Sequence, residues 1–483
     1  MSLFRRLSRF WEFFGDSDLA HVWTGFLAAV LIGVSLLWRF NYGSIHNYDD
    51  ALYAQVTREV SRGHAWPLTF SGERYNAKPP LPFWIGGLFV RLFGDRESSY
   101  RILSALSFLF IVGMAYRVLS RRVSEWAGFF SVLILLGSPM LVWFSRRVML
   151  DLPLAAFGVA LLVLPTRLPL SWGLFWSLAI CGWWTKEVAI LPALASALIT
   201  IAIYARPQLR KSSFGIGVLG FLISVFLLQF LRPAGRMWDP SFLHTVGQEA
   251  LLIPAPRDIY WDVFVSDSVF VWLLPIAFVW AIVRPKTLSP LATSLGLATL
   301  IHSTALAATK TILPYYLLPV FVYGLLFLAA MVPNSKARSL RIAVALLALL
   351  QIGRAQAFKM DPDHPDLDPA RATKELALLS AQKLAPSVPL CVFDTYFVGY
   401  RFYSDRPTVG FYTTDRALQA HLRVEEFQKF VFPVSGVDIP NVIRDRCGDI
   451  AILPSGLASR FQHLTVVAKV EPLVLVSSKV QSN

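Results

Sequence analysis

Charged residues are scarce in this sequence. Asp, Glu, Lys and Arg together make up only 16% of the 483 residues, whereas globular domains carry about a quarter. Hydrophobic residues make up 55%, and the mean hydropathy is +0.53. This composition excludes an ordinary soluble enzyme and a disordered chain. Because the apolar residues come in runs of about 20, the length of one bilayer crossing, the sequence indicates a polytopic α-helical membrane protein.

Cysteines and acidic residues are also few. The three cysteines, Cys181, Cys391 and Cys447, match neither a disulfide scaffold nor a zinc site. The 31 acidic residues are outnumbered by 45 basic residues, which gives a formal net charge of +14. In a membrane protein, basic cytosolic loops and contacts with lipid phosphates explain such an excess. Membrane lipids are therefore expected partners, and nucleic acid is not.

Apolar segments alternate with short polar connections over residues 1–353. About eleven segments are apolar enough to be transmembrane helices. They are expected at about 20–37, 102–119, 126–144, 152–165, 172–185, 187–204, 214–231, 263–283, 289–308, 313–332 and 341–353. Alternate connections are basic, as at Arg121 and Arg122, which places them and the N-terminus in the cytosol. The same rule places the long loop 38–101, the 145–151 loop and the C-terminus outside.

The pattern changes from about residue 354. Segments 389–394, 449–454 and 464–476 are rich in β-branched residues and have the length of strands. Helical patterns at 375–384 and 416–430 accompany them. These elements predict a small soluble α/β domain over 354–483, beside a transmembrane domain over 1–353. Cys391 and Cys447 both lie in this outer domain, where either a disulfide or two buried thiols would be stable.

The long first loop carries a cluster of charged residues. Asp49 and Asp50 follow the first span, and adjacent carboxylates at a membrane surface are costly unless they are hydrated, paired or functional. Either one could instead cap the helix beginning at Ala51, and both roles can coexist. Two stretches, 55–60 and 83–93, are expected to be amphipathic helices lying in the membrane interface.

Lys78 follows this acidic pair in the segment Tyr75-Asn-Ala-Lys-Pro-Pro-Leu-Pro. The prolines predict a rigid turn that enters the second interfacial helix. Lys78 is then held at headgroup depth. It is either a lysine that snorkels to the interface or a ligand for a phosphate group.

Three further charged residues are expected on the same side of the membrane. Asp151 ends the segment Arg146-Arg147-Val-Met-Leu-Asp, where it either pairs with the arginines or faces the first loop. Lys186 and Lys310 are outer lysines, which run against the positive-inside bias. Cations that converge with carboxylates at an apolar interface suit a lipid phosphate as substrate.

The order of these motifs resembles that of the GT-C glycosyltransferases. The motifs are Asp-Asp-x-x-Tyr in a long first loop, Tyr-x-x-Lys-Pro-Pro-Leu, Arg-x-x-x-Asp, a Thr-Lys turn and Lys followed by Leu-Pro-Tyr-Tyr-Leu-Leu-Pro. Within that group the chain is most similar to the protein O-mannosyltransferase-like branch and to the aminoarabinose lipid A transferases of bacterial inner membranes. The resemblance covers the whole membrane part and includes no motif of the C-terminal domain.

The resemblance implies roles for individual residues. Asp49 matches the catalytic first-loop aspartate, and Asp50 stands where the family usually has Glu. Asp151 matches the second acidic position, and Lys78 matches the lysine near the lipid phosphate. Two more basic positions near the sugar or phosphate are matched by Lys186 and Lys310.

The expected activity is therefore sugar transfer. The resemblance implies a polyprenyl-phosphate sugar as donor, an acceptor that is a lipid such as lipid A, a glycan or a protein, and an active site on the outer face of the cytoplasmic membrane. Asp49 would act as general base with inversion at the sugar, and Arg58 and Arg147 would assist the lysines at the donor phosphate. The alternative is a transporter or flippase for lipid-linked sugars, although transporter sites lie near the midplane of the bilayer.

No cofactor is required for this chemistry, and no nucleotide-binding fold is visible. A divalent metal would have His46, Asp49, Asp50 and His64 as candidate ligands, but their spacing matches no established site, so no metal residue is assigned. Asp49→Asn, Asp50→Asn and Asp151→Asn variants are expected to fold, because each change removes one charge from a surface taken to be hydrated.

Overall fold

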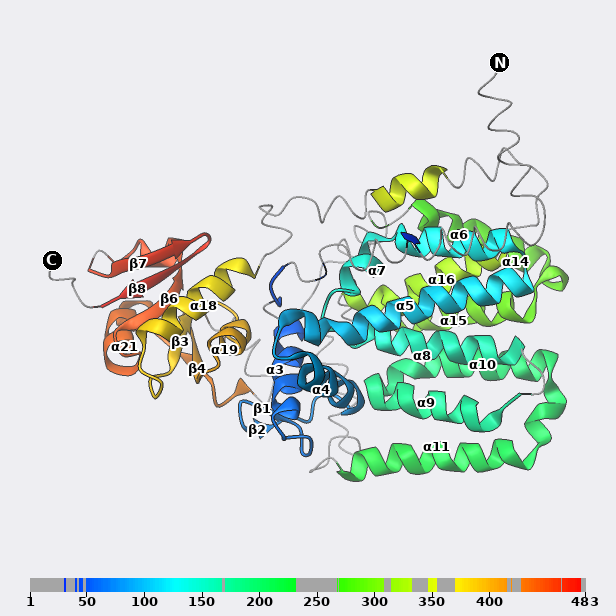
Figure 1. Ribbon diagram of the computed structural model, residues 1–483, viewed down its shortest axis with the longest axis horizontal. Coiled ribbons are helices and arrows are strands. Elements are labelled where there is room, and N and C mark those ends of the chain that lie inside the picture. Colours follow the sequence, from blue (N-terminus) through cyan, green and yellow to red (C-terminus); the bar gives the residue numbers. More distant parts are fainter. Residues whose placement is uncertain are drawn as a thin grey trace, which may run out of the picture. The chain divides into compact units, whose positions relative to one another are not determined.

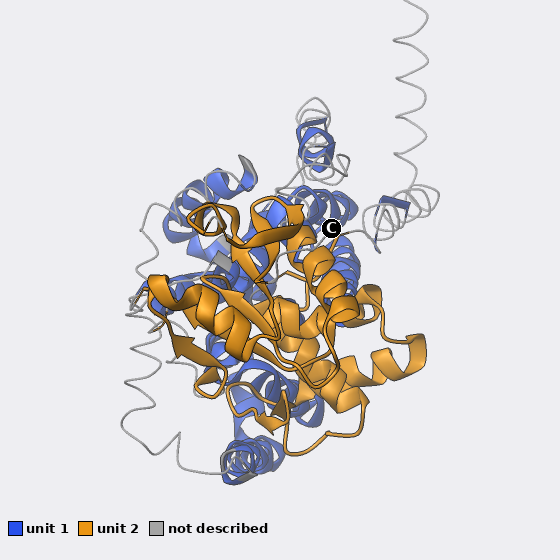
Figure 2. Ribbon diagram, turned by 90° about the vertical axis from the view of Figure 1, so that its left-hand side faces the viewer, with its two compact units in different colours: residues 1–40, 103–146, 150–360 blue, residues 41–102, 147–149, 361–483 orange. Residues whose placement is uncertain are grey.

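The computed structural model describes most of the chain (Figure 1). The described residues are 30–31, 40, 43–46, 49–166, 170–231, 267, 269–307, 314–331, 346–353, 370–414, 418, 427–461 and 463–478. They fall into two compact units (Figure 2). Unit 1 comprises residues 1–40, 103–146 and 150–360, and unit 2 comprises residues 41–102, 147–149 and 361–483.

Unit 1 is helical throughout its described part. Its helices are α5 (Glu97–Arg122, from residue 103), α6 (Glu125–Leu136), α7 (Pro139–Phe144), α8 (Asp151–Val163), α9 (Trp172–Lys186), α10 (Leu191–Tyr204), α11 (Ser212–Leu231), α14 (Leu274–Val283), α15 (Pro290–Ala307) and α16 (Leu318–Met331). Short 3₁₀ turns lie between or before them, among them η2 (Glu187–Ile190), η4 (Val269–Leu273) and η6 (Pro314–Leu317). The expected segments between 102 and 353 are thus helical over most of their described residues. Of the segment expected at 20–37, only residues 30 and 31 are described.

Three helical stretches in the described part of the chain are long and apolar enough to cross a membrane: Glu97–Arg122, Trp172–Tyr204 and Pro290–Ala307. The total of about eleven spans stays a prediction. The stretch 172–204 contains a sharp turn, because Glu187 has a φ of 47° and Ile190 packs against Gly182. The chain therefore turns between α9 and α10.

The segment expected at 126–144 is broken into α6 and α7. Ser138 caps α7 by accepting a hydrogen bond from the backbone N–H of Leu141 at 3.3 Å, and Pro139 takes the first helical position. Asp267 is buried and accepts hydrogen bonds from the Ser138 hydroxyl and from the backbone N–H of Met140 at 2.8 Å. A buried carboxylate thus holds the start of α7.

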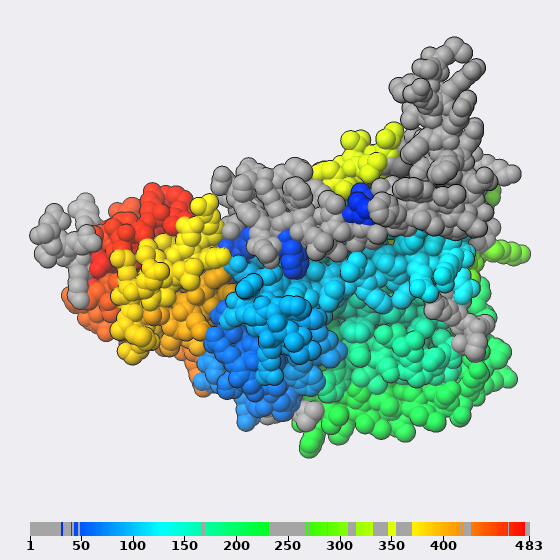
Figure 3. Space-filling model, in the orientation of Figure 1, coloured from blue at the N-terminus to red at the C-terminus, as the bar shows by residue number. Residues whose placement is uncertain are grey.

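Helix α8 lies at the centre of unit 1. It contacts α9, α10, α15 and α16, and nearly all of its residues are buried. Helix α11, green in Figure 3, instead has a row of exposed apolar side chains, which include Ile216, Leu219, Ile223, Phe226 and Phe230. Such an apolar surface suits contact with lipid.

Unit 2 joins the first loop to the C-terminal segment. The first loop forms α3 (Asp49–Ser61), the hairpin β1 (Thr69–Phe70) and β2 (Glu73–Arg74), and α4 (Leu81–Phe93). The C-terminal segment forms α18 (Arg371–Lys383), β3 (Leu390–Phe393), α19 (Val398–Ser404), β4 (Thr408–Tyr412), β5 (Val431–Pro433), η8 (Gly436–Asp438), α21 (Ile439–Arg446), β6 (Ile450–Pro454), α22 (Ser455–Ala458), β7 (Thr465–Val470) and β8 (Leu473–Ser477).

The strands of the C-terminal segment form a six-stranded mixed sheet in the order β5-β4-β3-β6-β8-β7. Neighbours from β5 to β6 are parallel, whereas β8 pairs antiparallel with both β6 and β7. The strands expected at 389–394, 449–454 and 464–476 are confirmed as β3, β6 and the β7–β8 hairpin. Most of the helix expected at 416–430 lies outside the described residues.

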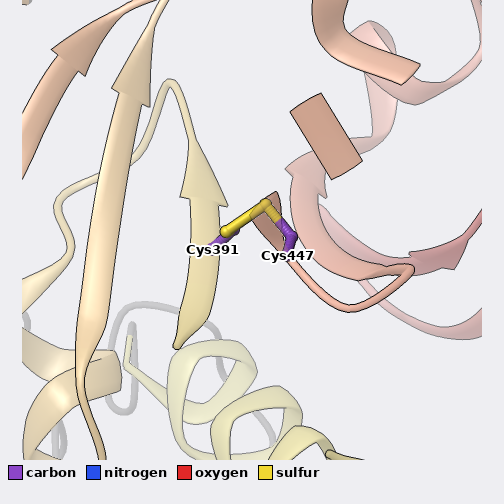
Figure 4. The surroundings of a disulfide bond; sticks show 2 residues. All are labelled: Cys391 and Cys447. Atoms are coloured by element: carbon purple, nitrogen blue, oxygen red, sulfur yellow. A yellow bond between two sulfur atoms is a disulfide. The ribbon is translucent and has the colours of Figure 1, made fainter. Parts of the chain in front are cut away.

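A disulfide joins Cys391 on β3 to Cys447 at the end of α21 (Figure 4). Their Cα atoms are 5.6 Å apart, and both residues are buried in the sheet core. The pairing that the sequence left open is therefore formed in the structure, and Cys181 is a free thiol.

The first loop packs on the C-terminal segment, whereas the sequence grouped it with the spans. Phe70 of β1 is fully buried, and its ring lies 5.5 Å from Phe427 and 6.4 Å from Phe397. Helix α3, expected to lie in the membrane interface, is also buried. That expectation is wrong because α4 packs against α3 along one side and α19 also contacts it, so little of its surface is left for a lipid interface.

Candidate active site

Asp50 forms a buried ion pair in unit 2. Its side chain is 3% exposed, and one carboxylate oxygen lies 3.1 Å from the guanidinium of Arg147. The carboxylate also accepts hydrogen bonds from the backbone N–H of His46, at 3.0 Å, and from that of Val148. Asp50 thus ties the start of α3 to the segment 147–149.

Asp49 is the first residue of α3 and is half-buried. Backbone N–H groups at a helix N-terminus carry partial positive charge, so an acidic side chain is well placed in the first turn. The contacts of Asp50 with His46 and Arg147 fix this end of the helix. The two carboxylates therefore differ: Asp50 holds the structure, and Asp49 is the more accessible of the two.

Lys78 lies in the turn between the β1–β2 hairpin and α4. Pro79 and Pro80 precede the first helical residue, Leu81, which confirms the predicted turn into a helix. The buried ring of Tyr75 packs edge-on against Phe83 of α4 at 5.8 Å. Lys78 is itself half-buried.

Arg58 was expected at the donor phosphate, but its guanidinium serves the interior of unit 2. It donates to Tyr100 at 3.1 Å, to the carboxylate of Asp95 and to the carbonyl of Phe402, whose ring centroid lies 3.9 Å away. Burial works to lower the pKa of Arg58, but Tyr100 and Asp95 outweigh it and hold the pKa above its ordinary value. Because its donors are already engaged, we do not assign Arg58 to the phosphate.

Unit 1 contains a second buried ion pair. Asp151, the first residue of α8, is 2% exposed and lies 2.5 Å from the ammonium group of Lys186. That ammonium also lies 4.4 Å from the ring centroid of Tyr316 and 5.3 Å from that of Tyr315. A carboxylate and two aromatic rings thus surround Lys186, and both rings lie within cation–π distance of its ammonium group.

The expectation that the acidic residues lie on a hydrated surface is wrong for Asp50 and Asp151. Both are buried and paired with a cation, so a neutral variant leaves that cation without its partner. Neither of the two interpretations of Asp151 included Lys186, the partner that the structure shows 35 positions away.

The last two predictions for the site concern Lys310 and a metal ion. Lys310 lies outside the described residues. For a metal, the described part of the chain contains no group of three or more His, Cys, Asp or Glu side chains that could hold an ion. His64 is exposed on the surface of unit 2.

Sequence reasoning missed several polar residues that organise these surroundings. Glu59 and Asp95 each bind groups of the first loop, and Asp267 holds α7. Their signal was a charged side chain in a stretch with buried neighbours. That signal does not identify the partner of each side chain, because the partners are distant in sequence. The tyrosines at 315 and 316 were noted as a motif but not as neighbours of Lys186.

Comparison with known proteins gives one family match and clear structural similarity. Residues 77–230 match the family described as dolichyl-phosphate-mannose-protein mannosyltransferase. This range includes Lys78, Arg147, Asp151 and Lys186 and leaves out Asp49. A search of curated protein sequences finds no match.

Two crystal structures of ArnT from Cupriavidus metallidurans have a similar fold. The apo structure is 18% identical over 95% of this chain and 97% of that chain, with a TM-score of 0.64. The structure bound to undecaprenyl phosphate is 18% identical over 96% and 99%, with a TM-score of 0.65. The similarity extends over both units of the chain.

Proposed function

We propose that this protein transfers one sugar from a polyprenyl-phosphate carrier. The proposal rests on its similarity to ArnT and to the protein-mannosyltransferase-like proteins of the GT-C glycosyltransferase family. The observation that carries the proposal is a pair of buried carboxylate–cation contacts, Asp50 with Arg147 and Asp151 with Lys186. Arg147 and Asp151 are only four residues apart. One short segment thus contributes to both pairs, in a chain rich in apolar helices.

The reaction is a displacement at the anomeric carbon of the sugar. An acceptor oxygen forms the new bond as the bond to the carrier phosphate breaks, and attack from the opposite face inverts the configuration. Asp49 accepts the proton of the acceptor, a contribution of about 10²–10⁴-fold to the rate. The transition state has oxocarbenium character, which a nearby carboxylate stabilises. We assign this role to Asp151.

The leaving group is the lipid phosphate, which gains negative charge as the bond breaks. Lys78 neutralises that charge, and we assign Lys186 and Lys310 to the same charge. ArnT has been crystallised with undecaprenyl phosphate, which supports a carrier of this chemistry here. Because a lipid phosphate is already a good leaving group, the reaction requires no nucleotide, and a divalent metal stays an open possibility.

We place the reaction on the outer face of the cytoplasmic membrane. The basic connections of unit 1 support this orientation by the positive-inside rule. The disulfide of unit 2 supports it as well, because disulfides persist in oxidising compartments. The acceptor is a hydroxyl or phosphate group of a lipid, a glycan or a protein.

The test is a transfer assay with purified protein and a polyprenyl-phosphate sugar. Asp49→Asn should lower the rate by at least about two orders of magnitude, which corresponds to roughly 3 kcal/mol. Asp445→Asn is the matched control, because Asp445 is exposed on α21. Lys78→Ala should raise the donor KM more than the acceptor KM, with Lys469→Ala as its exposed control.

Two results would overturn the proposal. One is a near-normal rate in Asp49→Asn. The other is movement of an intact lipid-linked sugar across vesicles without transfer, which would favour a flippase. Mass spectrometry of envelope lipids, glycans and proteins from a deletion strain would identify the acceptor.

A further inference from the structure

Glu59 is a buried carboxylate that no step of the proposed reaction uses. It lies on α3, ten residues after Asp49, and is 7% exposed. The hydroxyl of Thr69 donates to it at 2.5 Å, the backbone N–H of Ser71 at 2.6 Å and that of Gly72 at 3.3 Å. The side chain of Gln55 donates at 2.8 Å. Three of these four donors belong to the β1–β2 hairpin.

The turn of that hairpin needs such an acceptor. Phe70 pairs with Glu73, so Ser71 and Gly72 form a two-residue connection, and their φ angles are 57° and 80°. Positive φ at both positions is typical of a type I′ turn, which favours Asn or Gly at the first position. Ser71 has no such preference, and holding a non-glycine residue in this region costs free energy. Hydrogen bonds from both turn N–H groups to one ionised carboxylate offset that cost.

The hairpin leads directly to Lys78. The backbone N–H of Tyr75 donates to the carbonyl of Leu68 at 2.8 Å, which closes the hairpin, and Lys78 follows three residues later. The path of the chain between the turn and α4 is therefore set by how firmly the hairpin is held against α3. The same helix begins with Asp49.

We infer that Glu59 is a positioning residue for Lys78. It fixes the hairpin to α3 and so sets the distance between the acidic start of that helix and the lysine that receives the lipid phosphate. The inference rests on the proposed function for the identity of the ligand at Lys78. The arrangement of the hairpin is independent of that function.

Both oxygens of the carboxylate are used, and this makes Glu59→Gln an informative change. Glutamine offers only one acceptor oxygen, so its amide N–H₂ group faces donors that Glu59 satisfies. Ser71→Gly supplies the opposite change, because glycine adopts positive φ at little cost and the turn then depends less on the acceptor. The double variant should therefore recover part of what Glu59→Gln loses.

The experiment measures hairpin order and phosphate binding separately, on the full-length protein in detergent. Hydrogen exchange of the backbone amides between residues 68 and 78 reports on the hairpin. The Kd for undecaprenyl phosphate reports on the lipid-phosphate site. Glu59→Gln should speed exchange over 68–78 and weaken binding about tenfold, because the hairpin that leads to Lys78 then lacks one of its acceptor oxygens. Glu375→Gln, an exposed residue of α18, is the matched control and should change neither.

The background of Lys78→Ala distinguishes positioning from general stability. If Glu59 acts through Lys78, adding Glu59→Gln to Lys78→Ala should weaken binding little further. Full additivity of the two changes would overturn the inference, and so would unchanged exchange in Glu59→Gln.

If Glu59→Gln does not fold, Thr69→Val removes a single donor and tests the same contacts with the same expected direction. Failure of the wild-type protein to bind undecaprenyl phosphate would refute the proposed function. The exchange data would still decide whether Glu59 holds the hairpin.

Discussion

The pair formed by Asp50 and Arg147 makes a strong prediction about stability. Asp50→Leu removes the carboxylate that lies 3.1 Å from Arg147 and that accepts hydrogen bonds from the backbone N–H groups of His46 and Val148. The guanidinium remains buried, with 9% of its side chain exposed. Breaking a buried ion pair from one side costs about 3–5 kcal/mol. We therefore expect Asp50→Leu to lower the free energy of unfolding by that amount.

The partner change separates the ion pair from the loss of a side chain. Replacing both members of a buried pair with apolar residues of similar volume is often neutral or stabilising. Asp50→Leu combined with Arg147→Met should therefore be more stable than Asp50→Leu alone. Urea titration of the purified protein in detergent micelles, followed by tryptophan fluorescence, gives the free energy for the wild type, both single variants and the double variant.

The reasoning fails in either of two ways. A free energy for Asp50→Leu within about 0.5 kcal/mol of the wild type would mean that the site is not buried as described. A double variant whose loss equals the sum of the two single losses would mean that the side chains do not interact. Activity measured on the same samples adds a further distinction. A stable but inactive double variant would show that the pair also orients Asp49.

Three further predictions concern unit 2. A Cβ at Gly87 would lie 2.7 Å from Val60, so Gly87→Leu should separate α3 from α4. The free energy of unfolding should fall by about 1–3 kcal/mol, which a melting temperature below that of the wild type would show. Reduction of the disulfide, which spans 56 positions, should lower the free energy of unfolding by up to about 4 kcal/mol, and reductant should have no effect on Cys391→Ser. Burial works to raise the pKa of Asp405, but Arg62 outweighs it and holds the pKa below its ordinary value. The ionised Asp405 therefore stabilises the folded protein above about pH 4, and this stabilisation is lost as the pH falls through the lower pKa of the folded state. Melting curves of Asp405→Asn should not show this pH dependence.

The parts of the fold that could be predicted are those with a local signal. Apolar runs predicted the helices of unit 1, because burial or lipid contact over a whole helix requires an uninterrupted apolar segment. Strands β3, β6 and β7–β8 were predicted because β-branched residues fill short buried stretches between turn residues. The turn after Lys78 was predicted because proline restricts the backbone wherever it occurs.

The contacts of the candidate site could be predicted only in part. The residue types were identified, but the partner of Asp50 lies 97 positions away and that of Asp151 lies 35 positions away. Arg58 was predicted at the donor phosphate, whereas its guanidinium donates to the carbonyl of Phe402, 344 positions away. A local sequence pattern gives the charge of a side chain. It does not say which distant group neutralises that charge.

The discontinuity of unit 2 has a consequence for how the protein is made. Residues 41–102 leave the ribosome early, but Phe397 and Phe427, which pack on Phe70, and α19, which contacts α3, come from residues after 370. More than half of the chain is therefore synthesised and inserted before the first loop can complete its fold. Contacts between such distant segments form slowly, and their apolar surfaces stay open to other partners in the meantime. The burial of the loop that carries Asp49 and Lys78 is thus completed only near the end of synthesis.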